Sequence, residues 1–136
     1  MPIPRLDANI LLRYLSDEPP EQAERVAHLF GWISAGEVRV WLEDAVLAEV
    51  IWTLLSYYRD SKREITGWLL EVLAQIAIKA RDKDVLRVAL VLFQEKNVDF
   101  VDAVIAAQML SDGEFDIYSF DRDFDRIAGI TRIEPI

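Results

Sequence analysis

The 136-residue sequence contains no cysteine, which excludes a disulfide framework, thiolate zinc sites and cysteine nucleophiles together. It has a single histidine, His28, so a histidine zinc site or a serine triad has too few partners. We interpret His28, in ERVAHLFGWI, as a packed or surface helix residue. The sequence also has no glycine-rich phosphate loop. These absences exclude several common types of catalytic site.

Long uncharged hydrophobic runs are absent too. The apolar N-terminal stretch MPIPRLDANILLRYL includes Arg5, Asp7 and Arg13, so it resembles neither a signal peptide nor a membrane span. We therefore expect a cytoplasmic protein without membrane association. Hydrophobic residues make up 52% of the chain, which is enough for one compact core. A single domain over residues 1–136 is expected.

The net charge of −9 argues against a general nucleic-acid coat protein, because such proteins bind the phosphate backbone through Lys and Arg. The charge does not exclude nucleic acid as a substrate. A site crowded with carboxylates needs a cation before any phosphate can approach, and part of the acidic excess could lie at such a site.

Predicted strands and helices alternate along the chain. Strands are expected at residues 3–6, 38–42, 75–79, 116–120 and 131–133. Helices are expected at residues 8–15, from Pro20 to near Trp32, and at 45–58, 61–73, 83–96, 100–110 and 121–127. Ser61 and Glu64 form a capping-box pattern at one helix start. This alternation predicts a three-layer α/β/α sandwich with a mostly parallel central sheet of about five strands.

The stretch NVDFVDAVIAAQML places Asp99 and Asp102 at the start of an otherwise apolar helix. Both charges favour the positive end of the helix dipole, and Asp99 can accept a hydrogen bond from the backbone N–H of Asp102. The helix rises about 16 Å, and the following strand DIYSF spans about 16 Å. The start of the helix should therefore return to the end of the strand, which places Asp102 near Asp121.

Two further acids are expected at the same edge of the sheet. Asp7 directly follows the first strand, and Glu49 lies about one turn into its helix, in the nearly apolar stretch AVLAEVIWTLL. Capping, turn chemistry or solvent exposure explains each acid by itself. Four acids that meet at one edge repel one another and need a cation. The chemistry implied is hydrolysis of a phosphodiester by water that Mg²⁺ or Mn²⁺ activates.

Four segments together resemble the acidic motifs of the PIN-domain ribonucleases. They are LDANILLRYL with Asp7, AEVIWTL with Glu49, FVDAVIAA with Asp102, and YSFDRDFDRI with Asp121. Their order and spacing match over essentially the whole chain, which is most similar to VapC-like toxins of toxin–antitoxin pairs. The sequence departs from the family pattern in the first strand, PIPRL, where Pro4 can donate no ladder hydrogen bond.

The resemblance implies a metal-dependent endoribonuclease with four acids around Mg²⁺ or Mn²⁺: Asp7, Glu49, Asp102 and Asp121. It implies that Asp7 is the most direct ligand and that Asn9 orients Asp7 or a water molecule. Three other residues are expected to support the site: Ser119, Asp99 and Asp123. Of the two acids at the helix start, we expect Asp99 to cap the helix and Asp102 to bind the ion.

The resemblance also implies an RNA substrate, a homodimer and a small antitoxin partner. Arg13 and Arg122 lie closest in sequence to predicted ligands, so we expect them to contact the RNA backbone. The helix with Leu11, Leu12 and Leu15 and the helix with Val26, Leu29 and Phe30 are candidate walls of the antitoxin groove.

Two alternatives remain open at this point. One is a catalytically inactive PIN-like module that dimerises or binds a partner; a missing acid would favour it, and all four are present. The other is a phosphatase-type phosphotransferase, which needs a second Asp two residues after the first. That position is Asn9 in this sequence.

Overall fold

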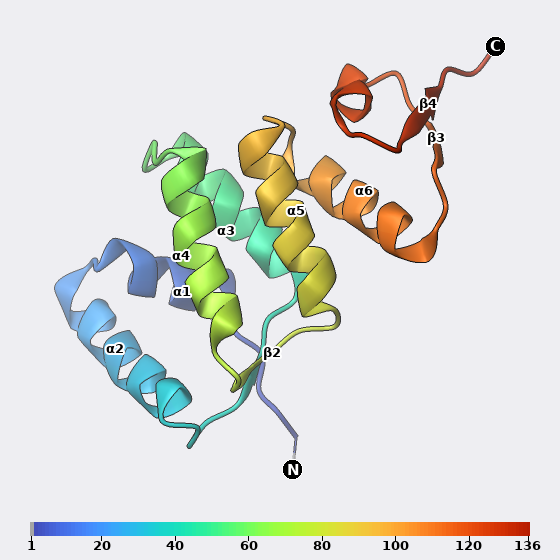
Figure 1. Cartoon of the computed structure of the whole chain (residues 1–136). Coiled ribbons are helices and arrows are strands. Elements are labelled where there is room, and N and C mark those ends of the chain that lie inside the picture. Colours follow the sequence, from blue (N-terminus) through green and yellow to red (C-terminus); the bar gives the residue numbers. More distant parts are fainter. Residues whose placement is uncertain (1) are drawn as a thin grey trace. The chain divides into compact units, whose positions relative to one another are not determined.

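The computed structural model describes residues 2–136 (Figure 1). The chain divides into two compact units, Met1–Arg81 and Asp82–Ile136, and each is considered by itself below. Among the described residues, no helix combines the length and the apolar character needed to cross a bilayer.

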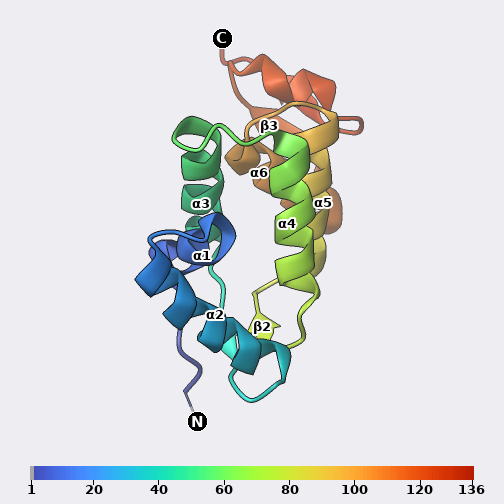
Figure 2. The same ribbon diagram turned by 90° about the vertical axis from the view of Figure 1, so that its left-hand side faces the viewer.

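Residues 2–81, the described part of the first unit, form four helices and one short strand pair. Its elements, in chain order, are α1 (Ala8–Ser16), α2 (Pro20–Ser34), β1 (Val40–Trp41), α3 (Asp44–Ser56), α4 (Lys62–Ala74) and β2 (Ile78–Lys79). The strands β1 and β2 are parallel, with Val40 opposite Ile78. Helix α1 contacts both α2 and α3 (Figure 2), so these three helices form the part of the unit that carries Asp7.

The expected first strand, residues 3–6, is reduced to a single parallel bridge between Arg5 and Trp41. Trp41 donates its backbone N–H to the carbonyl of Pro4 at 2.7 Å, and Leu6 donates to the carbonyl of Trp41 at 2.8 Å. Pro4 has no N–H, so the ladder cannot extend through that residue on its donor side. The segment nevertheless runs along β1 and leads directly into α1.

The apolar stripes of the first unit form its core. Leu11, Leu47 and Leu69 are completely inaccessible to solvent. The residues proposed as antitoxin groove walls belong mostly to this core as well, since Leu12 and Phe30 are buried. That mapping of the groove was wrong for Leu11, Leu12 and Phe30, because a side chain packed inside the unit offers no surface to a partner. It stays a prediction for Leu15, Val26 and Leu29.

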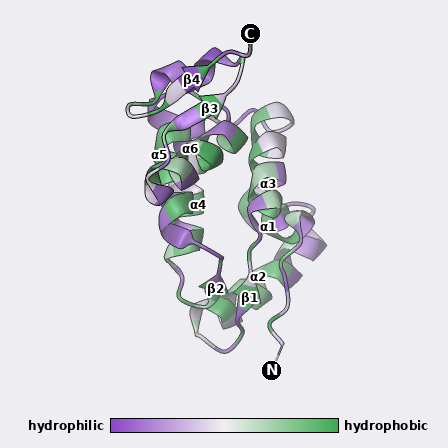
Figure 3. Cartoon of the chain, turned by 90° about the vertical axis from the view of Figure 1, so that its right-hand side faces the viewer, coloured by the Kyte–Doolittle hydropathy of each residue, from purple (hydrophilic) through white to green (hydrophobic). Residues whose placement is uncertain are grey.

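The second unit contains two long helices followed by a small strand pair. Its elements are α5 (Lys83–Glu95), α6 (Phe100–Asp112), β3 (Asp116–Tyr118), the short 3₁₀-helix η1 (Arg122–Arg126) and β4 (Thr131–Ile133). Helices α5 and α6 pack together, with Phe93 and Phe100 edge to face at 6.1 Å between ring centroids. The strands β3 and β4 are parallel, and the segment that carries η1 is mostly hydrophilic (Figure 3).

The mixed α/β class is confirmed, but the expected sheet of about five strands is wrong for the part of the chain that the structure describes. Two separate parallel pairs are found instead, β1 with β2 and β3 with β4. The apolar stretches 38–42 and 75–79 each contribute only two ladder residues. A ladder needs matching N–H and C=O groups on both strands, and hydrophobic content alone does not supply that register.

The capping box at the start of α4 is confirmed. The Ser61 hydroxyl accepts a hydrogen bond from the backbone N–H of Glu64 at 3.1 Å, and the Glu64 carboxylate accepts from the backbone N–H of Ser61 at 3.4 Å. These bonds satisfy two backbone donors that the helix itself leaves unpaired.

Replacing Ser61 with alanine removes this cap, and we expect the free energy of unfolding to fall by about 1 kcal/mol. Denaturant titration followed by circular dichroism measures the change. The control is Ser111→Ala, because Ser111 is an exposed serine within α6 and has no hydrogen bond from its hydroxyl among the described residues. A Ser61→Ala protein no less stable than the control would contradict the assignment of the cap.

Candidate functional site

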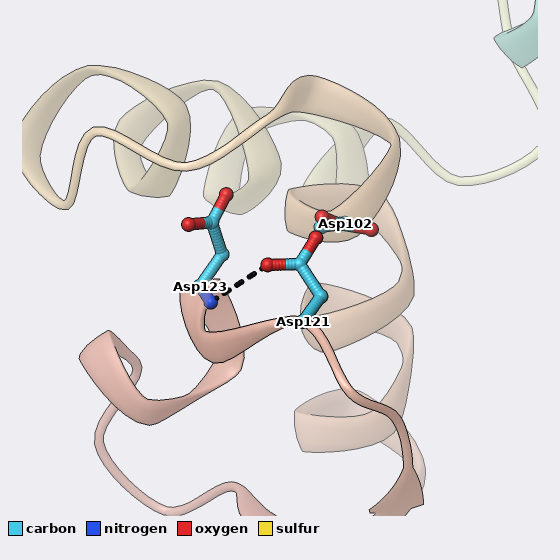
Figure 4. A group of neighbouring side chains, drawn as sticks. All are labelled: Asp102, Asp121 and Asp123. Carbon is cyan, nitrogen blue, oxygen red and sulfur yellow. Dashed lines mark hydrogen bonds between the residues drawn. The ribbon is translucent and has the colours of Figure 1, made fainter.

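Three aspartates lie together in the second unit. Asp102 is the third residue of α6, Asp121 directly precedes η1, and Asp123 lies within η1. Each offers one carboxylate oxygen, and these atoms all lie within 4.8 Å of one another. Figure 4 shows the carboxyl groups of Asp102 and Asp121 next to each other. We call these three residues the Asp102 cluster.

The path of the chain explains why Asp121 returns to the start of α6. The helix ends at Gly113, whose φ of +71° is in the left-handed region that favours glycine. The backbone N–H of Glu114 donates to the carbonyl of Met109 at 3.0 Å and closes the turn. Strand β3 then runs back along the helix, so Asp121 reaches Asp102, as the helix and strand lengths predicted.

Local hydrogen bonds hold the loop that carries Asp121. The backbone N–H of Asp121 donates to the Ser119 hydroxyl at 2.9 Å, and the Asp121 carboxylate accepts from the backbone N–H of Asp123 at 2.9 Å (Figure 4). Ser119 therefore lies where it can position Asp121, and its role in a metal site stays a prediction.

Two arginines that the sequence analysis did not single out also hold this loop. Arg132 donates to the carbonyl of Ser119 at 3.2 Å, and its guanidinium pairs with Asp125 at 3.0 Å. Arg126 lies 3.5 Å from the Asp123 carboxylate and donates to the carbonyl of Asn97 at 2.7 Å. Their contacts with the carbonyls of Ser119 and Asn97 give no sequence signal, because these residues lie 13 and 29 positions away along the chain.

Negative charge is concentrated in the Asp102 cluster. Burial raises the pKa of Asp102 to about 6, and its hydrogen bond to Asp121 and the charges of Asp121, Asp99 and Asp123 add to the increase. Like charges disfavour ionisation of a neighbouring carboxyl group. The Asp102 cluster therefore stabilises an added proton, and a divalent cation can neutralise the same charges.

The oxygen atoms of the Asp102 cluster fit a hard divalent cation. Mg²⁺ and Mn²⁺ prefer carboxylate oxygens and retain water in their coordination shell. One Asp121 oxygen accepts from the backbone N–H of Asp123, and the Asp121 carboxyl group also shares a hydrogen bond with Asp102, which an ion bound between the two groups would replace. The Asp102 cluster has the donor chemistry, the spacing and the excess of charge that a metal centre needs.

Asp99 does not cap α6 with its side chain, which corrects the expectation from the sequence. It occupies the N-cap position and its backbone carbonyl accepts from Ala103 at 2.9 Å, but its carboxylate makes no capping hydrogen bond. The carboxylate is exposed to solvent and its charge acts on Asp102 instead. Asp123, by contrast, belongs to the cluster, and the spacing Asp121-x-Asp123 is a signal for this turn.

The other predicted site residues belong to the first unit. Asp7 is at the N-cap of α1, where its carbonyl accepts from Ile10 at 3.1 Å, and its side chain makes no capping hydrogen bond. Asp7 and Asn9 are exposed, and so is Glu49 on α3. Solvent exposure therefore explains how Glu49 is tolerated in an apolar stretch. The meeting of these residues with the Asp102 cluster stays a prediction.

The two arginines expected to contact RNA have different surroundings. Arg13 lies on α1 and its Nε donates to the Gln22 side chain at 2.8 Å. Arg122 is exposed as the first residue of η1, between Asp121 and Asp123. Both are free of ion pairs among the described residues. Their contact with a substrate stays a prediction.

The comparison with known proteins agrees with the resemblance found in the sequence. The model of the PIN domain family matches residues 6–130 of this chain. A VapC ribonuclease of Aquifex aeolicus (strain VF5) is 23% identical over 130 residues, which are 96% of this chain and 95% of that protein. The matched range spans both units and includes the four acids that resemble the family motifs. The chain belongs to the PIN domain family.

Proposed function

We propose that the protein is a metal-dependent endoribonuclease that hydrolyses RNA phosphodiester bonds. The observation that carries this proposal is the Asp102 cluster, with its three carboxylate oxygens within 4.8 Å of one another and the raised pKa of Asp102. The similarity to a protein named as a VapC ribonuclease supports RNA as the substrate class.

In this proposal, residues 1–136 act as one PIN-like domain with a Mg²⁺ or Mn²⁺ site. The ligands are Asp7, Glu49, Asp102 and Asp121. Asn9 orients Asp7 or a metal-bound water, and Ser119 positions Asp121 through the hydrogen bond to its backbone N–H. Asp123 is placed to add a ligand oxygen, and Asp99 adds negative charge.

The bound ion would supply an acidified, positioned water and stabilise negative charge on a phosphoryl oxygen. The protein's own residues then have two tasks: they hold the carboxylates at fixed spacing and they orient the RNA backbone. Arg13 and Arg122 are proposed for the second task, since phosphate contacts set the register of a bound strand. No nucleophilic side chain is required.

The same proposal extends to the protein's partners. We infer a VapC-like toxin that acts in the cytoplasm as a homodimer and is inhibited by a small antitoxin protein. The family match and the VapC relative support this inference.

The first test incubates the purified protein with structured RNAs in Mg²⁺, in Mn²⁺ or in chelator, beside an Asp7→Asn variant. We expect cleavage that requires metal and falls at least about 100-fold in the variant, because an amide cannot supply the lost charge. The matched control is Asp17→Asn, since Asp17 is an exposed aspartate just after the other end of α1. Equal cleavage under chelation would eliminate the proposed chemistry.

A second readout, with an Asp121→Asn variant added, tests whether Asp7 and Asp121 bind the same ion. Mn²⁺ binding, followed by electron paramagnetic resonance, should weaken in Asp7→Asn and in Asp121→Asn by similar factors. Asp7 belongs to the first unit and Asp121 to the second. If Asp7→Asn binds Mn²⁺ as tightly as the unchanged protein, the ion is bound without Asp7 and the proposed set of four ligands is wrong.

A further inference from the structure

A cavity of about 590 Å³ lies between α1 and α2 in the first unit. Its lining includes Arg13, Arg25, His28 and Trp32 and contains no Asp or Glu among the described residues. The chain as a whole carries 24 acidic residues and 15 Lys and Arg. A lining with two arginines and no acid carries positive charge within an acidic protein, and it favours an anionic occupant.

The two arginines keep their charge available for a ligand. Neither Arg13 nor Arg25 forms an ion pair within residues 2–136, whereas Arg5 and Arg81 both pair with Glu43. The hydrogen bond from Arg13 Nε to the Gln22 side chain, at 2.8 Å, fixes the orientation of the guanidinium group. An arginine held in this way is suited to bind a phosphate through its remaining N–H donors.

Trp32 gives the cavity an aromatic surface. Its side chain lies on α2, lines the cavity and is 52% exposed, which is unusual for an aromatic residue that serves only as core. Val26 and Leu29 extend the apolar part of the lining. Exposed aromatic rings beside cationic side chains are the arrangement that binds unpaired nucleobases, since every base can stack on such a ring.

The cavity also lies close to one of the proposed catalytic acids within the same unit. Asn9 and Arg13 line it and occupy successive turns of α1, the helix that begins just after Asp7. Arg13 is six residues from Asp7, or about 9 Å along the helix axis. If one nucleotide of an RNA strand lies in the cavity, the neighbouring part of that RNA strand would therefore approach Asp7.

We propose that this cavity binds one nucleotide of a single-stranded RNA segment, with its phosphate on Arg13 and Arg25 and its base against Trp32. The inference rests on the proposed function, because that function supplies RNA as the ligand. The volume falls within the range of about 300 to 1,000 Å³ that is typical of small-ligand sites. A polypeptide is the competing occupant, and the unpaired arginines favour the polyanion.

The test measures the affinity of the full-length protein for a fluorescein-labelled single-stranded RNA of mixed sequence, by fluorescence anisotropy in EDTA. EDTA prevents metal-dependent cleavage during the titration. Trp32→Ala should weaken binding by about 5- to 100-fold. Arg25→Gln should also weaken binding and should reduce the slope of log Kd against log salt by about 0.7. Trp32→Phe and Arg25→Lys should restore most of the affinity.

Matched controls are Trp52→Ala and Arg63→Gln. Trp52 is an exposed tryptophan on α3 and Arg63 an exposed arginine on α4, and neither lines the cavity. Both controls should bind RNA within about twofold of the unchanged protein, because they remove the same chemical groups from other surfaces. Thermal unfolding of each variant checks that it is folded.

Several results would overturn the proposal. If Trp32→Ala and Arg25→Gln bind RNA as tightly as the controls, the cavity does not hold a nucleotide. If those variants instead lose affinity only for a polypeptide partner, the cavity is a protein-binding site. If the variants lose RNA binding but the unchanged protein cleaves no RNA, the cavity assignment holds and the nuclease proposal is contradicted.

Discussion

Replacing Asp102 with asparagine is expected to reduce metal-dependent RNA cleavage at least about 100-fold. Loss of a residue that only orients a metal ligand typically costs about 10- to 100-fold, so loss of a direct ligand should cost at least the upper value. Asp102 is the most strongly perturbed acid of the cluster, and asparagine keeps its shape while removing its charge. The initial rate of cleavage at fixed Mg²⁺ or Mn²⁺ measures the effect.

The control for this prediction is Asp112→Asn. Asp112 is an exposed aspartate at the other end of the same helix, so it undergoes the same chemical change outside the Asp102 cluster. Its rate should stay within about twofold of the unchanged protein. Cleavage by Asp102→Asn at the control's rate would show that the cluster does not support the reaction.

The second large effect concerns stability without metal. The pKa of Asp102 is raised from 3.8 to about 6 in the folded protein, so the folded state binds more protons than the unfolded state between these values. The contribution of the Asp102 carboxyl group to the free energy of unfolding is therefore fully present below about pH 4 and is lost as the pH rises through 6. At neutral pH in chelator, Asp102→Asn should be more stable than the unchanged protein, while Asp112→Asn should not.

The size of this gain should be on the order of 1 kcal/mol, because solvent screens a partly exposed carboxylate and reduces the effect of its pKa shift. Thermal unfolding of the two variants and the unchanged protein from pH 4 to pH 8 measures it. The difference in stability between Asp102→Asn and the unchanged protein should grow with pH. A difference that is constant over this range would contradict the charge repulsion.

Added metal should reverse this order of stability. At an Mn²⁺ concentration of 100 times Kd, binding to the folded state stabilises it by about 2.7 kcal/mol, which raises Tm by about 9 °C for a chain of this length. The Asp102→Asn variant should show little of this increase. An equal increase in both proteins would place the ion away from Asp102.

The Asp102 cluster is therefore expected to lower the stability of the protein without metal and to raise it when metal is bound. A cluster of acids lowers stability when no ion is bound, and a protein keeps such groups where their chemistry is used. Asp121 and Asp123 are held by backbone N–H groups and arginines, so the loop stays ordered despite the repulsion. The surrounding contacts therefore oppose the separation of the charges.

The sequence by itself determined the helices, the Ser61 cap and the approach of Asp102 to Asp121. These features depend on local spacing, on backbone donors within a few residues, and on the lengths of one helix and one strand. All of these can be read directly from the sequence. The four family motifs, carried on Asp7, Glu49, Asp102 and Asp121, were equally visible.

Only the tertiary structure decided which groups pair across long stretches of chain. The short ladders of β1 with β2 and of β3 with β4, and the support of Ser119 by Arg132, depend on register and on partners distant in sequence. The cavity beside Trp32 likewise depends on how α1 packs against α2. Hydrophobic patterns specify which residues are buried, and packing then selects the neighbours of each polar group.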